Sequence, residues 1–300
     1  MNSGFKIGVD GGGTKTECIL VDARGEIVAR QLAAGSNPSV VGPEQARLVV
    51  TDALCALITA SGSAPPREIV ATHLYMAGAP QFWQEFARTL TNFGRVTAAP
   101  DSLSILELAT RGQPGLVLHS GTGSFVAARA PDGAIHYAGG LGWRFGDPGS
   151  GYDVGRRAIA RALLELQGWA PPSRLGPTVR AAVPADAGAD AATLTRFFYQ
   201  HPEPNRQIAA LAPAVLRLAT EGDQTAHQLV IESTAELLAL AARVAAKLFP
   251  DQPLDALPAG LSGPILTHPT VMSALAPRSP LSLAPVAGTP IEAVRRLLLK

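Results

Sequence analysis

Three adjacent glycines near the start of the chain constrain its fold more than any other feature. They lie in the stretch GVDGGGTKTECILVD, residues 8–22, between the apolar runs 5–9 and 17–21. The two runs predict two strands joined by a tight glycine turn. Glycine loses more backbone freedom on folding than any other residue. A turn with three of them therefore indicates that something approaches its backbone closely, although a plain flexible hairpin is the alternative.

A second hairpin of the same kind lies in the middle of the chain. Residues 116–138 run as strand, Gly/Thr turn, strand, Asp-x-Gly-type turn and strand, which is the order already found near the start. Gly13 and Gly123 mark the first turns, and Gly25 and Gly133 mark the second ones. Because the turn residues agree at both positions, we expect an internal repeat rather than two unrelated hairpins. The chain should contain two related half-molecules, each beginning with a three-stranded meander.

Helices and strands alternate after the first meander, and helices predominate after the second, which places the chain in the α/β class. Pro213 is expected to bend the helix in which it lies. A connection rich in Pro, Ala and Gly occupies residues 168–190. Helices are expected at 43–62, 80–92, 102–111, 191–200, 205–221, 223–249 and in the closing GTPIEAVRRLLLK, and further strands near 70–76, 94–99 and 254–261.

The composition describes a globular chain without a strong electrostatic preference. The 300 residues are 47% hydrophobic and carry a formal net charge of +1. This charge gives no sign of a nucleic acid or an anionic membrane as partner. The two cysteines, Cys18 and Cys55, form no C-x-x-C pair and are expected to be buried free thiols. With a first strand close to Met1 and no apolar run of bilayer length, a soluble, cytoplasmic protein is expected.

Glycine-rich turns bind phosphates in three sequence contexts, and one of them fits this chain. A P-loop needs lysine directly after glycine at the start of a helix, whereas Thr14 separates Gly13 from Lys15 and a strand follows. A dinucleotide fingerprint needs a further glycine and again a helix. The remaining context is a hairpin whose backbone N–H groups and threonine hydroxyls surround a phosphate chain. Asp10, at the end of the first strand, would then hold Mg²⁺ through water.

Three further segments hold polar residues for which structural and functional roles compete. Asp101, in AAPDSLSILELA, stands between a strand and a helix, where it would either cap the helix or act as a general base. The segment 139–155 contains seven glycines around Asp147, which suits either a surface turn or a loop that binds sugar hydroxyls. Asn37 precedes a proline and is ordinary turn material unless its amide binds a sugar hydroxyl.

The blocks VDGGGTKT, PDS, SGTGS and GGLGWRFGDPGSGYDVGRRA resemble the signature blocks of one family, the N-acetylglucosamine kinases and BadF/BadG/BcrA/BcrD-type ATPases. This family belongs to the sugar kinase, Hsp70 and actin superfamily, and the blocks occur in order over most of the chain. The resemblance implies two ribonuclease H-like (actin-like ATPase) domains with an interdomain cleft for ATP. The first domain would comprise residues 1–114 and 287–300, and the second, with a helical insertion, residues 115–286.

The resemblance also implies roles for individual residues, with ATP and Mg²⁺ as cofactors and an amino sugar as acceptor. Asp101 would deprotonate the 6-hydroxyl of the sugar, and Asp10 would serve the metal. The sugar would contact Asn37, Gly140 and Asp147. Nucleotide contacts would come from Gly11, Gly12, Gly13, Thr14, Lys15, Ser120, Gly121, Thr122 and Gly123, and from Gly263 in the adenosine loop at 260–264.

Three positions depart from the family pattern. Pro264 replaces the second glycine of the adenosine loop. Pro148 stands where glutamate usually follows the aspartate, and Asp153 stands where an aromatic residue is common. Both lie near the expected sugar pocket. The choice between N-acetylglucosamine and glucosamine therefore stays open.

The expected function is ATP-dependent phosphorylation of an amino sugar at its 6-hydroxyl, and two alternatives are kept. One is an ATPase of the BadF type that activates a reductase or dehydratase through an iron–sulfur cluster. Cys18 and Cys55 lie in expected core elements of the first domain, which speaks against such a cluster. The other alternative is a non-enzymatic regulator that binds sugar and nucleotide. A homodimer is left open beside a monomer.

Overall fold

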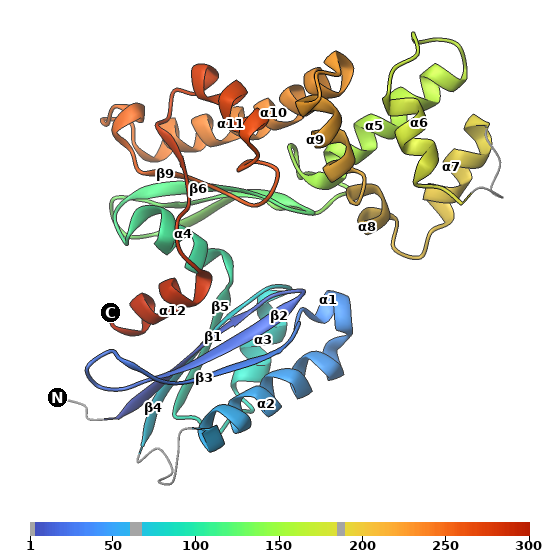
Figure 1. Cartoon of the computed structure of the whole chain (residues 1–300). Helices are drawn as coiled ribbons and strands as arrows, with labels where there is room; N and C mark the ends of the chain where they lie inside the picture. The colour runs from blue at the N-terminus through green and yellow to red at the C-terminus, as the bar shows by residue number, and fades with distance from the viewer. Residues whose placement is uncertain (1–3, 61–67, 185–189) are drawn as a thin grey trace. The chain divides into compact units, whose positions relative to one another are not determined.

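The computed structural model describes residues 4–60, 68–184 and 190–300. The chain divides into two compact units, one formed by residues 1–112 and 287–300 and the other by residues 113–286. Each unit contains a five-stranded mixed sheet with helices packed on it (Figure 1). Among the described residues, none of the helices combines the length and the apolar character that a membrane span requires.

The sheet of the first unit has the strand order β3-β2-β1-β4-β5. Strands β1, β2 and β3 form the antiparallel meander, and β4 and β5 continue the sheet parallel to β1. The strands are β1 (Phe5–Gly11), β2 (Lys15–Val21), β3 (Ile27–Ala34), β4 (Ile69–Met76) and β5 (Arg95–Pro100). The helices are α1 (Pro38–Val41), α2 (Pro43–Ala60), α3 (Pro80–Ala87), α4 (Ser102–Thr110) and α12 (Pro290–Leu298).

The sheet of the second unit has the order β10-β9-β6-β7-β8. Its strands are β6 (Gly115–Ser120), β7 (Ser124–Arg129), β8 (Ile135–Gly139), β9 (Ala259–Ser262) and β10 (Leu283–Pro285). The helices between β8 and β9 are α5 (Gly151–Leu166), α6 (Leu175–Ala181), α7 (Ala191–Gln200), α8 (Pro204–Ala209), α9 (Ala212–Thr220) and α10 (Gln224–Leu248). Helix α11 (Pro269–Leu275) joins β9 to β10.

The two sheets confirm the internal repeat. Strands β6, β7 and β8 pair antiparallel and β9 and β10 extend the sheet parallel to β6, as β1 to β5 do in the first unit. The second turns also agree, because Gly25 and Gly133 have φ values of +84° and +86°. Their N–H groups donate to Asp22 and Ala130 over 3.0 and 2.9 Å. The shared backbone geometry explains why glycine occurs at both positions.

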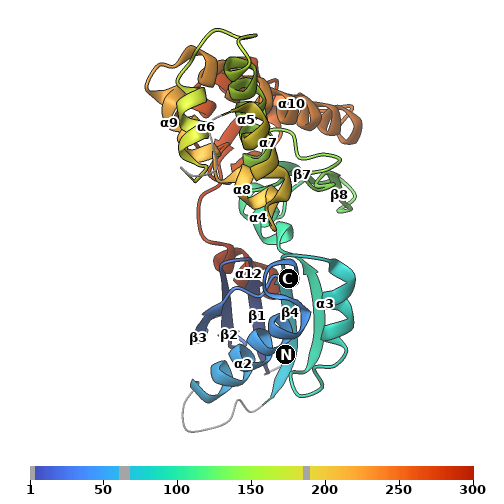
Figure 2. The same ribbon diagram turned by 90° about the vertical axis from the view of Figure 1, so that its right-hand side faces the viewer.

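Alternating side chains of the first sheet pack on helices from opposite faces. Ile7, Val9, Cys18 and Leu20 join a core with α2 and α3, whereas the neighbouring Ile19 and Val21 face another core. That second core includes three buried side chains of α12, namely Ile291, Val294 and Leu298. Figure 2 shows α12 and α3 on either side of the sheet. The last helix thus completes a core that begins with the first strand.

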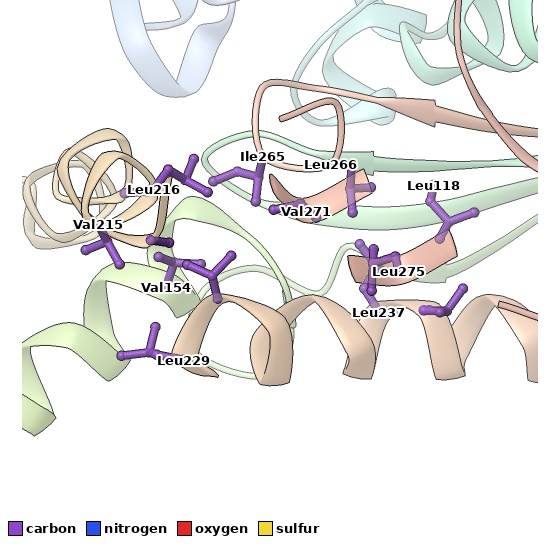
Figure 3. Packing of buried hydrophobic residues seen from close by; sticks show 14 of the residues in the cluster. Leu118, Val154, Val215, Leu216, Leu229, Leu237, Ile265, Leu266, Val271 and Leu275 are labelled. Carbon is purple, nitrogen blue, oxygen red and sulfur yellow. The ribbon is translucent and has the colours of Figure 1, made fainter. Parts of the chain in front are cut away.

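In the second unit, most of the helices share one large core over a single face of the sheet. Leu118 of β6, Leu237 of α10 and Leu275 of α11 belong to this core and are labelled in Figure 3. Helix α10 crosses the sheet in contact with β6, β7 and β8 (Figure 2). The apolar side chains of α10 thus pack against the sheet on one face of the helix.

Several expected elements differ in detail. The helix expected at 205–221 is two helices, because Pro213 lies in the first turn of α9 and cannot continue a helix from α8. The proline-rich connection contains α6, and the strand expected at 254–261 shortens to β9. Cys55 is exposed on α2, so its expected burial was wrong, whereas Cys18 is a buried free thiol. Residues 61 and 62, the expected end of α2, lie outside the described residues.

Candidate functional site

The first glycine turn contains one glycine that packing explains and two that it does not. A Cβ on Gly11 would lie 2.2 Å from the Cε atom of buried Met76, so a side chain has no room there. On Gly12 and Gly13 the nearest atoms would be 3.5 and 3.8 Å away, which is ordinary van der Waals contact. Neither residue has a positive φ. The protein itself could accept side chains at both positions, so their bare backbone fits a ligand that approaches the turn.

The segment that follows β3 is held tightly against this turn. The backbone N–H groups of Ser36 and Asn37 donate to the carbonyl oxygen of Gly12 over 3.0 and 3.2 Å. A Cβ on Gly35 would lie 2.2 Å from the carbonyl oxygen of Gly13. The Asn37 side chain accepts a bond from the N–H of Ser39 over 3.0 Å and so begins α1. The structure therefore brings Asn37 to the hairpin, with its amide oxygen engaged as a helix cap.

Two carboxylates lie where parallel strands end. Strand β4 pairs with both β1 and β5, and all three run in the same direction. Asp10 is the penultimate residue of β1, and Asp101 directly follows β5. Burial raises the pKa of Asp10 to about 6, and the negative charge of Asp101 adds to this effect. Lys15 and the Ser104 hydroxyl act in the opposite direction and favour the ionised form. The pair thus interacts electrostatically at one edge of the sheet.

Asp101 does not act as the cap that its position before α4 suggests. Its side chain makes no capping hydrogen bond to the helix. Instead, the Ser104 hydroxyl donates to the backbone carbonyl of Asp101 over 2.6 Å. Burial raises the pKa of the Asp101 carboxyl. Hydrogen bonds from the N–H groups of Ser102 and Asp101 partly offset this rise. A carboxylate with a raised pKa and no capping role has the properties of a general base.

Glu17 was missed by the sequence analysis, yet it lies directly opposite Asp10 in the β1–β2 pair. Its carboxylate is buried and forms ion pairs with Lys15 at 3.2 Å and Arg30 at 3.0 Å. The bond to Lys15 limits where that ammonium group can move beside the turn. An acidic residue directly before the apolar residues 18–21 of the same strand was the available signal.

The second hairpin is anchored from two sides. The N–H groups of Gly151 and Tyr152, at the start of α5, donate to the carbonyl oxygens of Gly121 and Thr122 over 2.8 and 3.3 Å. The Ser120 hydroxyl donates to the carbonyl of Gly149 over 2.6 Å. Hydrogen bonds therefore hold the turn on the N-terminus of a 16-residue helix, a place where the helix dipole favours negative charge.

The expected adenosine loop meets the same hairpin. A Cβ on Gly263 would lie 2.1 Å from the carbonyl oxygen of Ser120, and Gly263 has a φ of +86°. Glycine is therefore required there by packing and by backbone conformation. Pro264 is exposed, and the N–H of Ile265 reaches the Ser120 carbonyl over 3.5 Å. Loop and hairpin thus form one structural unit.

Asp147 lies beside the turn of the second hairpin. A Cβ on Gly123 would be 2.8 Å from its Oδ2 atom. The other oxygen, Oδ1, is buried and has no hydrogen-bond partner among the described residues. Burial raises the pKa of the Asp147 carboxyl, against the effect of the N–H groups of Ser124 and Gly142. Asp147 also has a φ of +65°, which is uncommon for an aspartate. A strained, incompletely bonded carboxylate at this place fits a ligand contact.

Gly140 lies at the start of the same loop, where its N–H donates to the carbonyl of Ser124 over 3.0 Å. Its φ of +65° explains the glycine by backbone conformation. A Cβ there would also lie 3.3 Å from the Cβ atom of Phe125. The structure thus places Gly140 next to the hairpin, and local geometry already accounts for it.

A cavity of about 840 Å³ opens beside the second hairpin, wholly within the second unit. Gly121, Thr122 and Gly151 line one part of it, and helices α8 and α9 with the loop after β9 line the rest. Leu216 and Ile265, which both line the cavity, lie next to each other in Figure 3. The cavity combines an apolar wall with the backbone of a glycine turn, which suits a flat base attached to a phosphate chain.

Asp10, beside the first hairpin, carries the kind of oxygen ligand that Mg²⁺ prefers. Within the described ranges, His, Cys, Asp and Glu side chains form no group of three that could hold a metal ion alone. A magnesium ion at Asp10 would therefore take most of its oxygen ligands from water and phosphate. This arrangement is normal for Mg²⁺ that accompanies a nucleotide.

The chain is similar to known proteins along most of its length. The profile of the BadF/BadG/BcrA/BcrD ATPase family matches residues 7–259. An N-acetylmuramic acid/N-acetylglucosamine kinase of Clostridium acetobutylicum is 25% identical over 238 residues, which cover 78% of this chain and 76% of the relative. A glucosamine kinase of Vibrio cholerae is 30% identical over 171 residues, covering 56% and 57% of the two chains.

A solved structure from Chromobacterium violaceum, assigned as an N-acetylglucosamine kinase, superposes with a TM-score of 0.78 and 29% identity over 99% of both chains. Together with the two matching sheets, this likeness confirms the expected actin-like α/β fold.

Proposed function

Since the chain belongs to the BadF/BadG/BcrA/BcrD ATPase family, we propose that it transfers the γ-phosphoryl group of ATP to the 6-hydroxyl of an amino sugar. N-acetylglucosamine and glucosamine are the proposed acceptors, because the relatives above are kinases of such sugars. The observation that carries the proposal is Asp101, a half-buried carboxylate at the end of a parallel strand that makes no capping bond.

The proposed donor contacts come from both glycine turns. The N–H groups of Gly12 and Gly121 donate within their own turns. In this proposal other backbone N–H groups of residues 11–15 and 120–123 bind the phosphate groups, and the absent side chains of Gly12, Gly13 and Gly121 leave room for the phosphates to approach. Asp10 would hold Mg²⁺, whose charge stabilises the phosphate oxygens when the ion is bound. The nucleoside occupies the 840 Å³ cavity beside the second turn. In this proposal residues 1–114 and 287–300 provide the base, and residues 115–286 provide the nucleoside site.

Asp101 orients the acceptor hydroxyl and accepts its proton as the phosphoryl group is transferred. Asn37, Gly140 and Asp147 contact the sugar in this proposal. For Asp147, the support is a buried oxygen atom that lacks a hydrogen-bond partner among the described residues. Most of the catalysis would come from positioning and charge stabilisation, as in other phosphoryl transfers.

The direct test is sugar-dependent release of ADP, measured over glucosamine, N-acetylglucosamine, N-acetylmannosamine and glucose. We expect turnover with one or both of the first two sugars. A 6-deoxy analogue of the accepted sugar should bind without turnover, since it lacks the proposed acceptor atom. ATP hydrolysis that no sugar stimulates would contradict the proposal.

Asp101→Asn should reduce kcat by about 10²–10⁴ while the affinities for ATP and sugar change little. The exposed turn residue Asp132 provides a matched control, and Asp132→Asn should retain full turnover. Steady-state kinetics and calorimetric binding of both variants check this prediction. Normal turnover in Asp101→Asn would contradict the proposed role of Asp101 as general base.

A further inference from the structure

His119 is the penultimate residue of β6 and lies directly before the second glycine turn. Its imidazole ring stacks on Phe125 of β7, with a centroid separation of 5.0 Å and an interplanar angle of 22°. The Nδ1 atom lies 3.2 Å from the hydroxyl oxygen of Ser262, the last residue of β9. Contacts from two neighbouring strands thus fix the orientation of the ring.

The other ring nitrogen faces the turn. A Cβ on Gly121 would lie 3.4 Å from the Nε2 atom of His119, and apart from the adjoining residues 120 and 122 no other heavy atom of the described chain lies within 4 Å of that point. Gly121 also lacks a positive φ, so neither its conformation nor a steric clash requires glycine. The Nε2 atom of His119 therefore borders the space above Gly121, and Gly121 also lines the large cavity.

The imidazole is uncharged in this environment. Burial lowers the pKa of His119 to about 4, so the ring carries a single N–H at neutral pH. Which nitrogen holds that proton depends on the partner of the other one. Ser262 can donate its hydroxyl proton to Nδ1, and the N–H is then on Nε2. In this tautomer the ring presents a donor to the space above Gly121.

We propose that His119 is a nucleotide-binding residue whose Nε2–H donates a hydrogen bond to a phosphate oxygen above Gly121, with Ser262 holding the required tautomer. The proposal rests on the proposed use of ATP and names a contact that the glycine turns alone do not supply. A neutral N–H suits this place, because its hydrogen bond to an ionised phosphate oxygen is charge-assisted even though the donor carries no charge.

A packing role is the competing explanation, since the ring also fills the space beside Phe125. His119→Phe keeps an aromatic ring there and removes both nitrogen atoms. His119→Gln keeps an N–H donor without the ring. His136, an exposed histidine in β8 of the same sheet, gives the matched control His136→Phe.

The experiment measures the calorimetric affinity of each variant for ADP and for adenosine at neutral pH. We expect His119→Phe to lose about tenfold in ADP affinity, the effect of one hydrogen bond to a charged group, and to bind adenosine as the wild type does. His119→Gln should retain most of the ADP affinity, and His136→Phe all of it. Ser262→Ala, a smaller change, should also weaken ADP binding but not adenosine binding.

An equal loss for ADP and adenosine, or no loss for ADP in His119→Phe, would overturn the proposal. If that variant does not fold, Ser262→Ala decides by the same comparison of the two ligands. A wild-type protein that binds ADP but phosphorylates no amino sugar would refute the proposed function and leave the His119 contact standing. Failure of the wild type to bind ADP would overturn both.

Discussion

Glycine occurs at different positions of this chain for different physical reasons, and the sequence alone does not distinguish them. At Gly11 a side chain would clash with Met76, and at Gly263 it would clash with the Ser120 carbonyl. At Gly12 and Gly121 a Cβ meets only ordinary contacts. Packing therefore requires the first two glycines, whereas it does not require the other two, which belong to the proposed phosphate contacts.

This difference gives a prediction for the first turn. Gly11→Ala should destabilise the protein by about 1–3 kcal/mol, because Met76 is buried and must move. Gly12→Ala should leave the free energy of unfolding nearly unchanged and weaken ADP binding. Denaturant unfolding and calorimetry of the two variants make the comparison. The idea of a phosphate site fails if Gly12→Ala binds ADP normally.

The raised pKa of Asp10 predicts a dependence of stability on pH. In the unfolded chain this carboxyl has a pKa near 3.8, and in the folded protein it is about 6. The folded state therefore holds the proton more tightly, and stability is lost as the pH rises through this interval. Asp10→Asn should thus be more stable than the wild type by about 2–3 kcal/mol above pH 7, and nearly equal to it near pH 4.

Thermal unfolding of the wild type and Asp10→Asn between pH 4 and pH 8 checks this sign. Asp132→Asn, in an exposed turn, is the control and should show no comparable trend. A wild-type protein that gained stability relative to Asp10→Asn with rising pH would show that the burial of Asp10 is compensated in the folded state.

At the scale of elements, the repeated unit is a meander extended by two parallel strands. In each half, the hairpin turn contacts the end of the parallel strand next to it, or the loop that follows that strand. In the second half this contact runs between Gly263, after β9, and Ser120, at the end of β6. The turn geometry of the hairpin therefore depends on a residue more than a hundred positions away.

Gly133 and Gly263 have the same φ of +86°, so comparing their alanine variants separates the energy of the contact between Gly263 and Ser120 from that of backbone strain. A Cβ on Gly133 would meet nothing within 4 Å, so Gly133→Ala should cost only the backbone strain, about 1 kcal/mol. Gly263→Ala adds a clash with backbone and should cost several times more. Equilibrium unfolding of both variants measures the difference. Equal losses would mean that the loop after β9 moves away freely.

The local features were predictable from the sequence, and the long-range ones were not. Both meanders follow from strand periodicity and from turn residues such as Gly25 and Gly133. Each of these glycines closes a turn of four residues, so its role can be recognised from the local sequence. The position of Asp147 against Gly123 depends on how a glycine-rich loop folds back, which no local pattern specifies. Likewise, Cys55 lies in an apolar run, but its exposure depends on which face of α2 meets the sheet.

At the scale of the whole molecule, each unit has a core of its own, and the last helix belongs to the first unit. Leu298 of α12 packs with Ile19 and Val21 of β2, whereas Leu275 of α11 belongs to the core of the second unit. Both leucines are buried. Their truncation should therefore weaken different parts of the chain.

Leu298→Ala and Leu275→Ala should each cost about 2–5 kcal/mol. Hydrogen exchange should become faster in β1 and β2 for the first variant and in β6 and β9 for the second, because each leucine supports its own sheet. Mass spectrometry of peptides from both sheets makes the measurement. Uniform acceleration over the whole chain in both variants would show that the two cores unfold as one.

The return of α12 to the first sheet has a consequence during synthesis on the ribosome. Residues 113–286, which form the second unit, are translated between the first strands and the helix that covers one of their faces. At typical elongation rates this interval lasts on the order of 10 s. Throughout that time Ile19, Val21 and Tyr75 lack their partners from α12, so the nascent chain exposes an apolar surface that chaperones can recognise. The half of the protein that is made first is therefore the half that finishes folding last.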